Sequence, residues 1–174
     1  NLPGPDLLIW LKRLDAEIGN FGKALEWFFD SGDVESALRL TGALWYFWFW
    51  NGYMIEGNGW LKKALAEGGG VSSNVRANVL HGAGVYAIHA GDTDRAKSFI
   101  RESLELCEDT RNRRLMAHIL NTLGLWLRSQ GDLRQSIAYF ERSLVLCRET
   151  GAEAMGASSM AELAVVNLQS GDLD

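Results

Sequence analysis

A segment of 17 residues occurs twice in this chain, and its repetition constrains the fold more than any other feature of the sequence. The segment reads GDTDRAKSFIRESLELC from Gly91 and GDLRQSIAYFERSLVLC from Gly131. A third Gly-Asp pair begins one further period along the chain, at Gly171, and Gly52 lies close to one period before Gly91. A fixed period of about 40 residues is typical of arrays of stacked helical units. The sequence therefore predicts a repeat architecture for the whole chain.

Apolar residues recur three and four positions apart, and no stretch alternates with the period of two that a strand requires. Glycine and polar turns divide this pattern into nine predicted helices, each antiparallel to its neighbours. We expect them at about residues 6–18, 21–30, 34–50, 53–67, 73–90, 92–109, 112–130, 132–150 and 153–170. The expected boundaries include a break at Gly19 and Asn20, an N-cap at Asp33 and an N-cap at Ser72 or Ser73. The predicted fold class is all-α, a right-handed α-solenoid of antiparallel helix pairs.

The composition is that of one soluble domain, because 47% of the 174 residues are apolar and 22% are charged. We therefore expect residues 1–174 to form a single helical-repeat domain. The net charge of −5 argues against a nucleic-acid partner. The longest wholly apolar run, residues 43–50, is far shorter than a membrane-spanning helix, and no secretory signal is evident. We expect a cytoplasmic segment of a longer protein, with no membrane partner.

No motif in the sequence carries a reaction. The phosphate-binding pattern GxxxxGK followed by Ser or Thr, the zinc pattern HExxH and the pair CxxC are all absent. Ser103 and Ser143 occupy equivalent packing positions in successive repeats, and Cys107 and Cys147 do the same as reduced thiols. We therefore expect no catalytic residue, no metal ion and no cofactor.

The two helices of each repeat are predicted to approach closely at small residues, with large residues filling the space beside them. The small residues are Gly84, Ala96, Gly124 and Ser136, and the large residues are Leu80, Ile100, Leu120 and Phe140. Together with the Gly-Asp turn, this combination resembles the tetratricopeptide repeat, here with turns between pairs that lengthen the usual period of about 34 residues. Arg148 stands where that repeat usually has Pro. The resemblance implies tetratricopeptide-like helix pairs over residues 72–174.

Residues 10–67 carry a second resemblance, to a more specific family. The matching positions are 14–17, Asn20, 24–27, Gly32, Asp33, Leu44, Trp45, Trp48, Gly52, Glu56, Gly57, Trp60 and Leu61. They are similar to the helical segment that follows the nucleotide-binding domain in bacterial signal-transduction ATPase regulators of the NB-ARC-like, LuxR-type class. Ile18, Gly19 and Gly22 depart from that pattern. The resemblance implies that residues 1–67 are family-specific helices of a sensor arm, whose partner is the ATPase domain of the same parent chain.

The first helices of the pairs are predicted to line a concave groove that binds a ligand. The candidate residues are Tyr46, Phe49, Trp50, Asn78, His81, Val85, Ile88, His118, Asn121, Leu125 and Arg128. Asn78 is expected beside His118, and His81 beside Asn121. A groove with an aromatic end, amides and imidazoles in the middle and one Arg suits a peptide or a small polar ligand such as a sugar or nucleotide. The alternative is that Asn and His only join neighbouring helices while exposed to water.

Residues 44–50, LWYFWFW, form the most unusual stretch, because a helix of this sequence is apolar on every side. Helical spacing places Trp45, Trp48 and Phe49 on one side, which we expect in the core. Tyr46 and Trp50 point to a neighbouring side, which we expect to remain available to a partner.

Two functions remain open. The first is a non-catalytic scaffold that docks a protein or peptide partner, or the ATPase domain of its parent. The second is a sensor arm that binds a small-molecule inducer in the groove and relieves inhibition of that ATPase. We also expect self-association through the last helix, where Met160, Leu163, Ala164, Val165 and Leu168 lack a covering helix.

Overall fold

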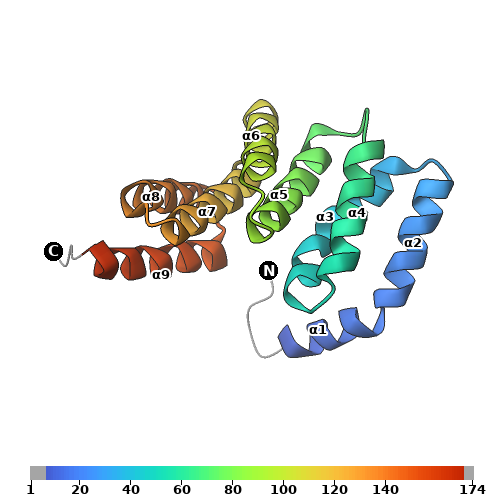
Figure 1. Ribbon diagram of the computed structural model, residues 1–174, viewed down its shortest axis with the longest axis horizontal. Helices are drawn as coiled ribbons and strands as arrows, with labels where there is room; N and C mark the ends of the chain where they lie inside the picture. The colour runs from blue at the N-terminus through green and yellow to red at the C-terminus, as the bar shows by residue number, and fades with distance from the viewer. Residues whose placement is uncertain (1–6, 171–174) are drawn as a thin grey trace. The chain divides into compact units, whose positions relative to one another are not determined.

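The computed structural model describes residues 7–170, and within this range the chain forms helices joined by short turns and loops, with no strand (Figure 1). The helices are α1 (Leu7–Ala16), α2 (Ile18–Asp30), α3 (Val34–Trp50), α4 (Met54–Glu67), α5 (Ser73–His89), α6 (Thr93–Thr110), α7 (Arg113–Ser129), α8 (Leu133–Thr150) and α9 (Glu153–Ser170). The predicted all-α class and the nine predicted helices are confirmed for the described residues. All bounds except the start of α2 lie within two residues of the prediction, which is the usual uncertainty of helix ends.

The helices form two compact units, Asn1–Ser103 and Leu104–Asp174, and the division falls within α6. Each unit has its own packing. The right-handed curvature expected of the whole array stays a prediction.

Aspartate and asparagine side chains begin several of the helices, as their N-cap propensity predicts. Asp33 accepts a hydrogen bond from the Ser36 backbone N–H (3.2 Å), and Asp132 accepts one from that of Gln135 (3.1 Å). The turn before Asp132 is closed by Gly131, whose φ of +82° lies in the left-handed region that glycine adopts without strain. The Gly-Asp pair of the repeat is therefore a helix stop followed at once by a helix start.

The break predicted at Gly19 and Asn20 is wrong, because α2 already begins at Ile18. The boundary lies at Glu17, whose carboxylate accepts a hydrogen bond from the Asn20 side-chain amide (2.6 Å). Gly19 and Asn20 occupy the first turn of α2, where backbone N–H groups have no helical partner and a helix breaker does little harm. Ser72 does stand at the N-cap of α5, but its side chain makes no cap hydrogen bond.

The core of the first unit is built around Trp48, which is completely buried. It shares one apolar cluster with Trp45, with Leu25 of α2 and with Leu61 of α4. The burial of Trp45 and Trp48 was predicted from helical spacing. Gly57 of α4 lies directly under Trp48, and a Cβ added there would stand 2.8 Å from the Trp48 Cβ. The indole therefore occupies space that only a glycine in the facing helix leaves free.

In the second unit a glycine also faces a large side chain of the paired helix. Here the glycine lies on the first helix of the pair and the large side chain lies on the second. A Cβ at Gly124 of α7 would lie 2.6 Å from Cε1 of Phe140 on α8, and Phe140 is completely buried. Beside it, the Ser136 hydroxyl donates to the Gly124 carbonyl oxygen (2.8 Å). The predicted close approach of the paired helices is confirmed here, and in the first unit Gly84 and Ile100 repeat it.

The buried serines serve helix packing. Ser143 on α8 donates to the Ala117 carbonyl oxygen on α7 (2.8 Å), and its hydroxyl lies 3.1 Å from that of Ser159 on α9. Ser159 in turn donates to the side-chain oxygen of Asn121 (3.0 Å), so the hydroxyls join three helices. In the first unit, Ser103 donates to the Ala77 carbonyl oxygen (2.7 Å). Because each hydroxyl has a partner, its burial carries no penalty for an unsatisfied polar group.

Cys107 and Cys147 are buried free thiols, as the repeat positions predict. Burial, together with the neighbouring Glu108 carboxylate, raises the pKa of Cys107 to about 11. Burial also raises the pKa of Cys147. Both side chains are therefore neutral at physiological pH, and they act as small apolar residues in the packing.

Candidate functional site

The aromatic stretch of α3 divides into a buried side and an exposed side. Trp45 and Trp48 face the core, whereas Tyr46 and Trp50 keep 61% and 67% of their surface exposed. Phe49 lies between these groups and is half-buried at the edge of the core cluster. The division predicted from the sequence is thus confirmed for both pairs, because residues three and four apart on a helix share a side.

The exposed rings are held by contacts with one another and with α5. Phe49 is central, with ring centroids 5.3 Å from Trp50, 5.4 Å from His89 and 5.4 Å from the buried Tyr86, all in edge-to-face or nearly edge-to-face orientation. Tyr46 and Trp50 lie 6.2 Å apart with their planes inclined at 55°. Edge-to-face arrangements of this kind are the ones that aromatic pairs prefer. We call Tyr46, Phe49, Trp50 and His89 the aromatic surface.

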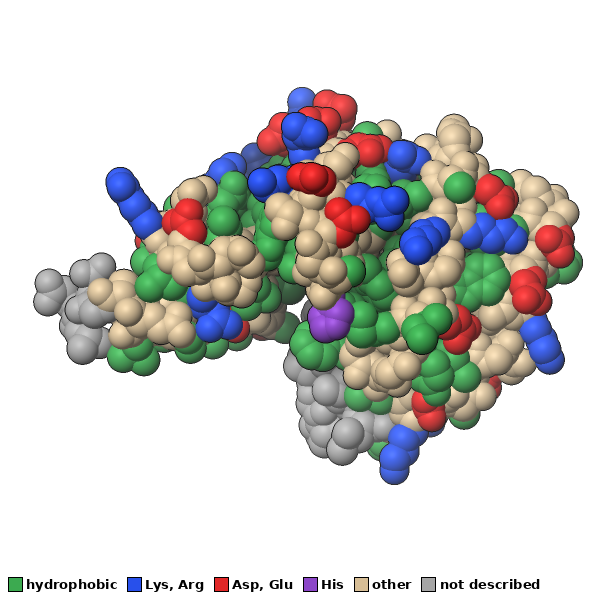
Figure 2. Space-filling model, viewed as in Figure 1, with side chains coloured by type: hydrophobic (Ala, Val, Ile, Leu, Met, Phe, Trp, Pro, Cys, Tyr) green, Lys and Arg blue, Asp and Glu red, His purple; other side chains and the backbone are tan. Residues whose placement is uncertain are grey.

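The helical segments that carry the aromatic surface contain no Asp, Glu, Lys or Arg. The sequence has no Asp, Glu, Lys or Arg between Leu40 and Trp50 on α3, nor between Ala77 and His89 on α5. Elsewhere, on the face of the molecule shown in Figure 2, acidic and basic side chains are interspersed and neither sign dominates. The face shown in Figure 2 therefore carries no basic stripe of the kind that marks a nucleic-acid interface.

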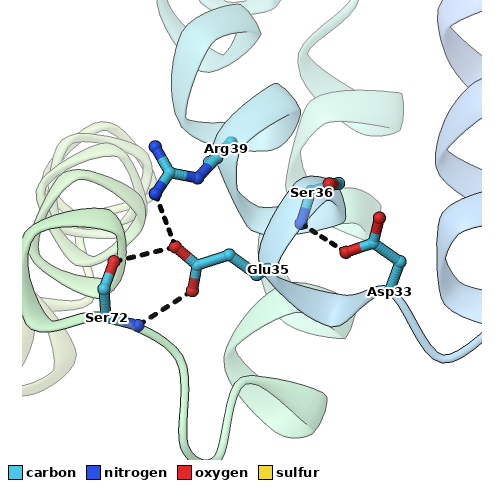
Figure 3. A network of polar contacts seen from close by, with 5 residues as sticks. All are labelled: Asp33, Glu35, Ser36, Arg39 and Ser72. Carbon is cyan, nitrogen blue, oxygen red and sulfur yellow. Dashed lines mark hydrogen bonds and ion pairs between the residues drawn. The ribbon is translucent and has the colours of Figure 1, made fainter.

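A polar network joins the start of α3 to the loop that leads into α5 (Figure 3). The Glu35 carboxylate accepts hydrogen bonds from the backbone N–H and the hydroxyl of Ser72, both at 2.9 Å, and from the Arg39 guanidinium at 2.8 Å. The Ser72 backbone N–H is the main cause that lowers the pKa of Glu35, and the Ser72 hydroxyl and Arg39 add to it. The network explains why Ser72 does not cap its own helix, because its hydroxyl is already donated to Glu35.

The other groove candidates of the first unit are less accessible than predicted. His81 was expected to line an open groove, but it is only 3% exposed, and its ring packs edge-to-face on Trp45 at 5.2 Å. The reason is Gly82, which lets α5 approach Trp45 so closely that the adjacent imidazole is enclosed. Asn78 is half-buried and donates to the Gly42 carbonyl oxygen (2.8 Å). Val85 and Ile88 are half-buried as well.

In the second unit, Asn121 also departs from the expected groove position. It is 7% exposed, and its side-chain oxygen is used by the Ser159 hydroxyl of α9. His118 and Leu125 are half-buried, and burial is the main cause that lowers the pKa of His118, with the Arg114 charge adding to it. Arg128 forms an ion pair with Glu162 of α9 (3.4 Å). The expected pairing of Asn78 with His118, and of His81 with Asn121, stays a prediction.

His89 belongs to the aromatic surface and was missed by the sequence reasoning. It lies four residues after Val85, one turn further along the face of α5 that was already considered, so helical spacing could have found it. Within the described residues there is no group of three or more His, Cys, Asp or Glu side chains arranged to hold a metal ion. The described helices likewise include none long and apolar enough to cross a membrane.

Comparison with known proteins identifies the family of the chain. A sequence profile described as "Tetratricopeptide repeat" matches residues 75–149 and, in a second overlapping match, residues 115–174. Together the two matches extend over residues 75–174, which is more than half of the chain. The chain belongs to the tetratricopeptide-repeat family. The close contact between Gly124 and Phe140 and the Gly-Asp turn therefore belong to tetratricopeptide helix pairs. The fold class is an α-solenoid.

A solved structure supports the same fold over more of the chain. "Crystal structure of BtubC (BKLC) from P. vanneervenii" aligns with a TM-score of 0.73 and 18% sequence identity, covering 95% of this chain and 74% of that one. At this identity the likeness shows the fold alone. No curated protein sequence matched this tetratricopeptide-repeat chain. Residues 10–67 precede the matched repeats. Their resemblance to signal-transduction ATPase regulators stays a prediction.

Proposed function

We propose that this tetratricopeptide-repeat chain is a non-catalytic scaffold that docks a protein or peptide partner through the aromatic surface of α3 and α5. The observation that carries the proposal is the exposure of Tyr46 and Trp50, at 61% and 67%, on a helix whose other tryptophans are buried. Large aromatic residues exposed together are unusual on a surface that has no partner.

The aromatic surface has the properties of a binding hot spot. Trp and Tyr are the residues whose truncation most often costs about 2 kcal/mol or more at protein interfaces. Phe49 holds the Trp50 ring from the side, at 5.3 Å, so the ring loses little freedom when a partner binds. The exposed rings of Tyr46 and Trp50, beside the half-buried Phe49, therefore offer a partner a large contact area. Binding there costs little side-chain entropy.

The setting that we propose is an arm of a cytoplasmic, signal-transducing transcriptional regulator. The support is the resemblance of residues 10–67 to the helices that follow the ATPase domain in such regulators. In that setting the ATPase domain of the same parent chain is one partner of the aromatic surface. Sequencing the parent gene on both sides tests this, because a P-loop upstream or a helix-turn-helix downstream is expected and their absence would exclude the setting.

Panning a random peptide library displayed on phage against the chain tests the scaffold function. We expect enriched peptides that bind the wild-type chain and lose binding to the Trp50→Ala variant. Trp27→Ala is the matched control, because Trp27 is equally exposed, at 63%, but lies on α2 outside the aromatic surface. If no enriched peptide distinguishes Trp50→Ala from Trp27→Ala, the proposed surface is wrong.

The alternative function, a small-molecule sensor, can be tested with the same chain. His81 and Asn121 are buried, so two of the polar groups expected in the middle of the groove are not accessible to a ligand. A thermal-shift screen with a metabolite library raises the melting temperature only if a small molecule binds the folded chain. A hit that survives Trp50→Ala would favour the sensor function over the scaffold function.

A further inference from the structure

The last described helix, α9, has an apolar stripe along its exposed side. The stripe follows the spacings i, i+3, i+4, i+7, i+8 and i+11, which place its members on one face of a helix. Its members are all exposed and are Ala157, Met160, Ala161, Ala164, Val165 and Leu168. We call these six residues the α9 stripe. The opposite side of the helix is buried at Ser159 and Val166.

The repeat shows what kind of surface the α9 stripe is. One period earlier, Ala117 and Gly124 of α7 are equivalent to Ala157 and Ala164, and both are buried. Phe140 of α8 lies directly against Gly124. This side of the first helix of a pair therefore accepts another helix at close range. On α9 the same side is exposed.

Charge favours a partner that is itself uncharged at the contact. Glu153 and Glu162 are the two charged residues of α9, and neither belongs to the α9 stripe. Glu162 forms an ion pair with Arg128 of α7 (3.4 Å). A charged partner surface would lose its hydration here without gaining an ionic contact, which is costly. A second copy of the chain presents an equally uncharged stripe.

The order of side-chain sizes makes the α9 stripe complementary to itself. In an antiparallel pair centred between residues 162 and 163, each member of the stripe faces another member. The facing pairs are Ala157 with Leu168, Met160 with Val165 and Ala161 with Ala164. Large side chains thus meet smaller ones at the ends, and two alanines let the helices approach at the centre. A parallel pair would oppose Leu168 to Leu168 and Ala157 to Ala157, which leaves uneven packing.

The area of the α9 stripe indicates how strong the contact is. Six exposed apolar side chains on one face amount to an area on the order of a few hundred Å², the size at which an apolar patch marks an interaction site. Two copies then bury less than about 1,200 Å² in total, the range of weak, transient interfaces. The contact is therefore reversible and depends on concentration.

We propose that two copies of the chain associate through the α9 stripe, with the two α9 helices antiparallel about a two-fold axis between residues 162 and 163. Such an interface is isologous, so each facing pair of side chains occurs twice. The inference is independent of the proposed scaffold function, because no residue of the aromatic surface takes part.

A charge-pair experiment tests the antiparallel register. By sedimentation velocity, Met160→Glu and Val165→Lys should each weaken association about tenfold or more, because each places an unpaired charge in an apolar contact. The double variant should regain association, because the new carboxylate of each copy faces the new ammonium group of the other. Added salt should weaken the double variant more than the wild type. Val145→Glu, at an exposed position on α8, should associate like the wild type.

Cysteine cross-linking gives a second measure of the register. A mixture of Ala157→Cys and Leu168→Cys chains should form a disulfide between different variants under oxidised glutathione. Ala157→Cys alone should not, because the two copies of residue 157 lie 11 positions apart along the pair, about 16 Å, which is beyond disulfide reach. The native Cys107 and Cys147 are buried and do not compete.

Thermal melting separates lost association from lost folding, since the substituted positions are exposed and the melting temperatures should stay close to that of the wild type. A wild type that is strictly monomeric at millimolar concentration would overturn the proposal. So would a double variant that associates as weakly as the single variants, or a cross-link of Ala157→Cys to itself, which indicates a parallel pair.

Discussion

Trp48 and Trp50 are two positions apart on α3, yet their surroundings are opposite. Trp48 is completely buried over Gly57, whereas Trp50 is largely exposed. Positions two apart on an α-helix are separated by a turn of about 200°, so one faces the core when the other faces solvent. The same residue type thus stabilises the fold at one position and remains free for a partner at the other.

The first prediction compares their truncation. Trp48→Ala should lower the free energy of unfolding by about 3–5 kcal/mol, because it removes a buried indole and leaves a cavity. Trp50→Ala should change it by no more than about 0.5 kcal/mol. Urea unfolding of both variants measures this. An equal loss for the two would mean that the whole aromatic stretch is core and would remove the candidate site.

Arg111 is the one described residue other than glycine with a positive φ, at 54°. The equivalent position in the next repeat is Gly151, with φ of 66°. The left-handed conformation brings the Cβ of an L residue close to its own backbone and costs about 1 kcal/mol, which glycine avoids.

The second prediction follows from this difference. Arg111→Gly should raise the free energy of unfolding by about 0.5–1 kcal/mol, because the relief of strain exceeds the added freedom of the unfolded chain. Arg101→Gly, at an exposed position inside α6, is the matched control and should lower it by about 1 kcal/mol. Thermal and urea unfolding measure both. A loss of stability in Arg111→Gly would contradict the strain argument.

At the scale of helix pairs, the third prediction concerns the contact between Gly124 and Phe140. Gly124→Ala should cost about 1–3 kcal/mol, because the new methyl group would overlap the Phe140 ring. Phe140→Ala should cost about 3–5 kcal/mol. In the double variant the methyl group meets no ring, so the combined loss, measured by urea unfolding, should be smaller than the sum of the single losses.

Gly59 provides the control for this experiment. It lies inside α4 with open space where a Cβ would be placed, so Gly59→Ala should raise the free energy of unfolding by about 0.5–1 kcal/mol. Strict additivity of Gly124→Ala and Phe140→Ala would mean that the two residues are not in contact.

The fourth prediction uses the Glu35 network, which holds the loop before α5 against α3. The pKa of Glu35 is lowered from its ordinary value of 4.5, first by the Ser72 backbone N–H, so the charged carboxylate stabilises the folded state. Its contribution is fully present above that ordinary value and is lost as the pH falls below it through the lowered pKa.

Urea unfolding of the wild type and Glu35→Gln tests this linkage. The variant should be less stable at neutral pH, and the difference should shrink on acidification to about pH 3. Glu105→Gln, on the exposed side of α6, should show no such convergence. A difference that stays constant from neutral to acidic pH would show that the Glu35 charge contributes nothing.

At the scale of the whole molecule, each unit carries its own core, and α9 presents apolar side chains that nothing in the described chain covers. Met160 and Leu168 are 50% and 65% exposed. One period earlier, Leu120 of α7 occupies the position equivalent to Met160 and is buried. The exposed apolar stripe of α9 thus includes a position that is buried one repeat earlier.

The fifth prediction is that the chain self-associates through α9, because a second copy then shields this stripe from water. Sedimentation velocity should show a concentration-dependent rise in mass, abolished by Met160→Glu. Val145→Glu, at an exposed apolar position on α8, should leave the association intact. A strictly monomeric wild type at high concentration would contradict the prediction.

The repeat period was enough to predict the all-α class, the nine helices of the described chain and the burial of Phe140. Helical spacing was enough to separate Trp48 from Trp50. These features depend on interactions within one repeat or one helix, where sequence distance fixes spatial distance. They could therefore be predicted without knowing how distant segments meet.

Tertiary contacts decided the remaining features. Ser72 lies at the N-cap of α5, but Glu35, from the start of α3, takes its hydroxyl. His81 and Asn121 have the periodicity of groove residues, but Trp45 encloses the first and Ser159 binds the second. The surroundings of a side chain at the edge of a helix depend on how closely the neighbouring helix approaches. The distance between neighbouring helices is determined by glycines and large residues on both of them. It therefore cannot be predicted from the sequence of one helix alone.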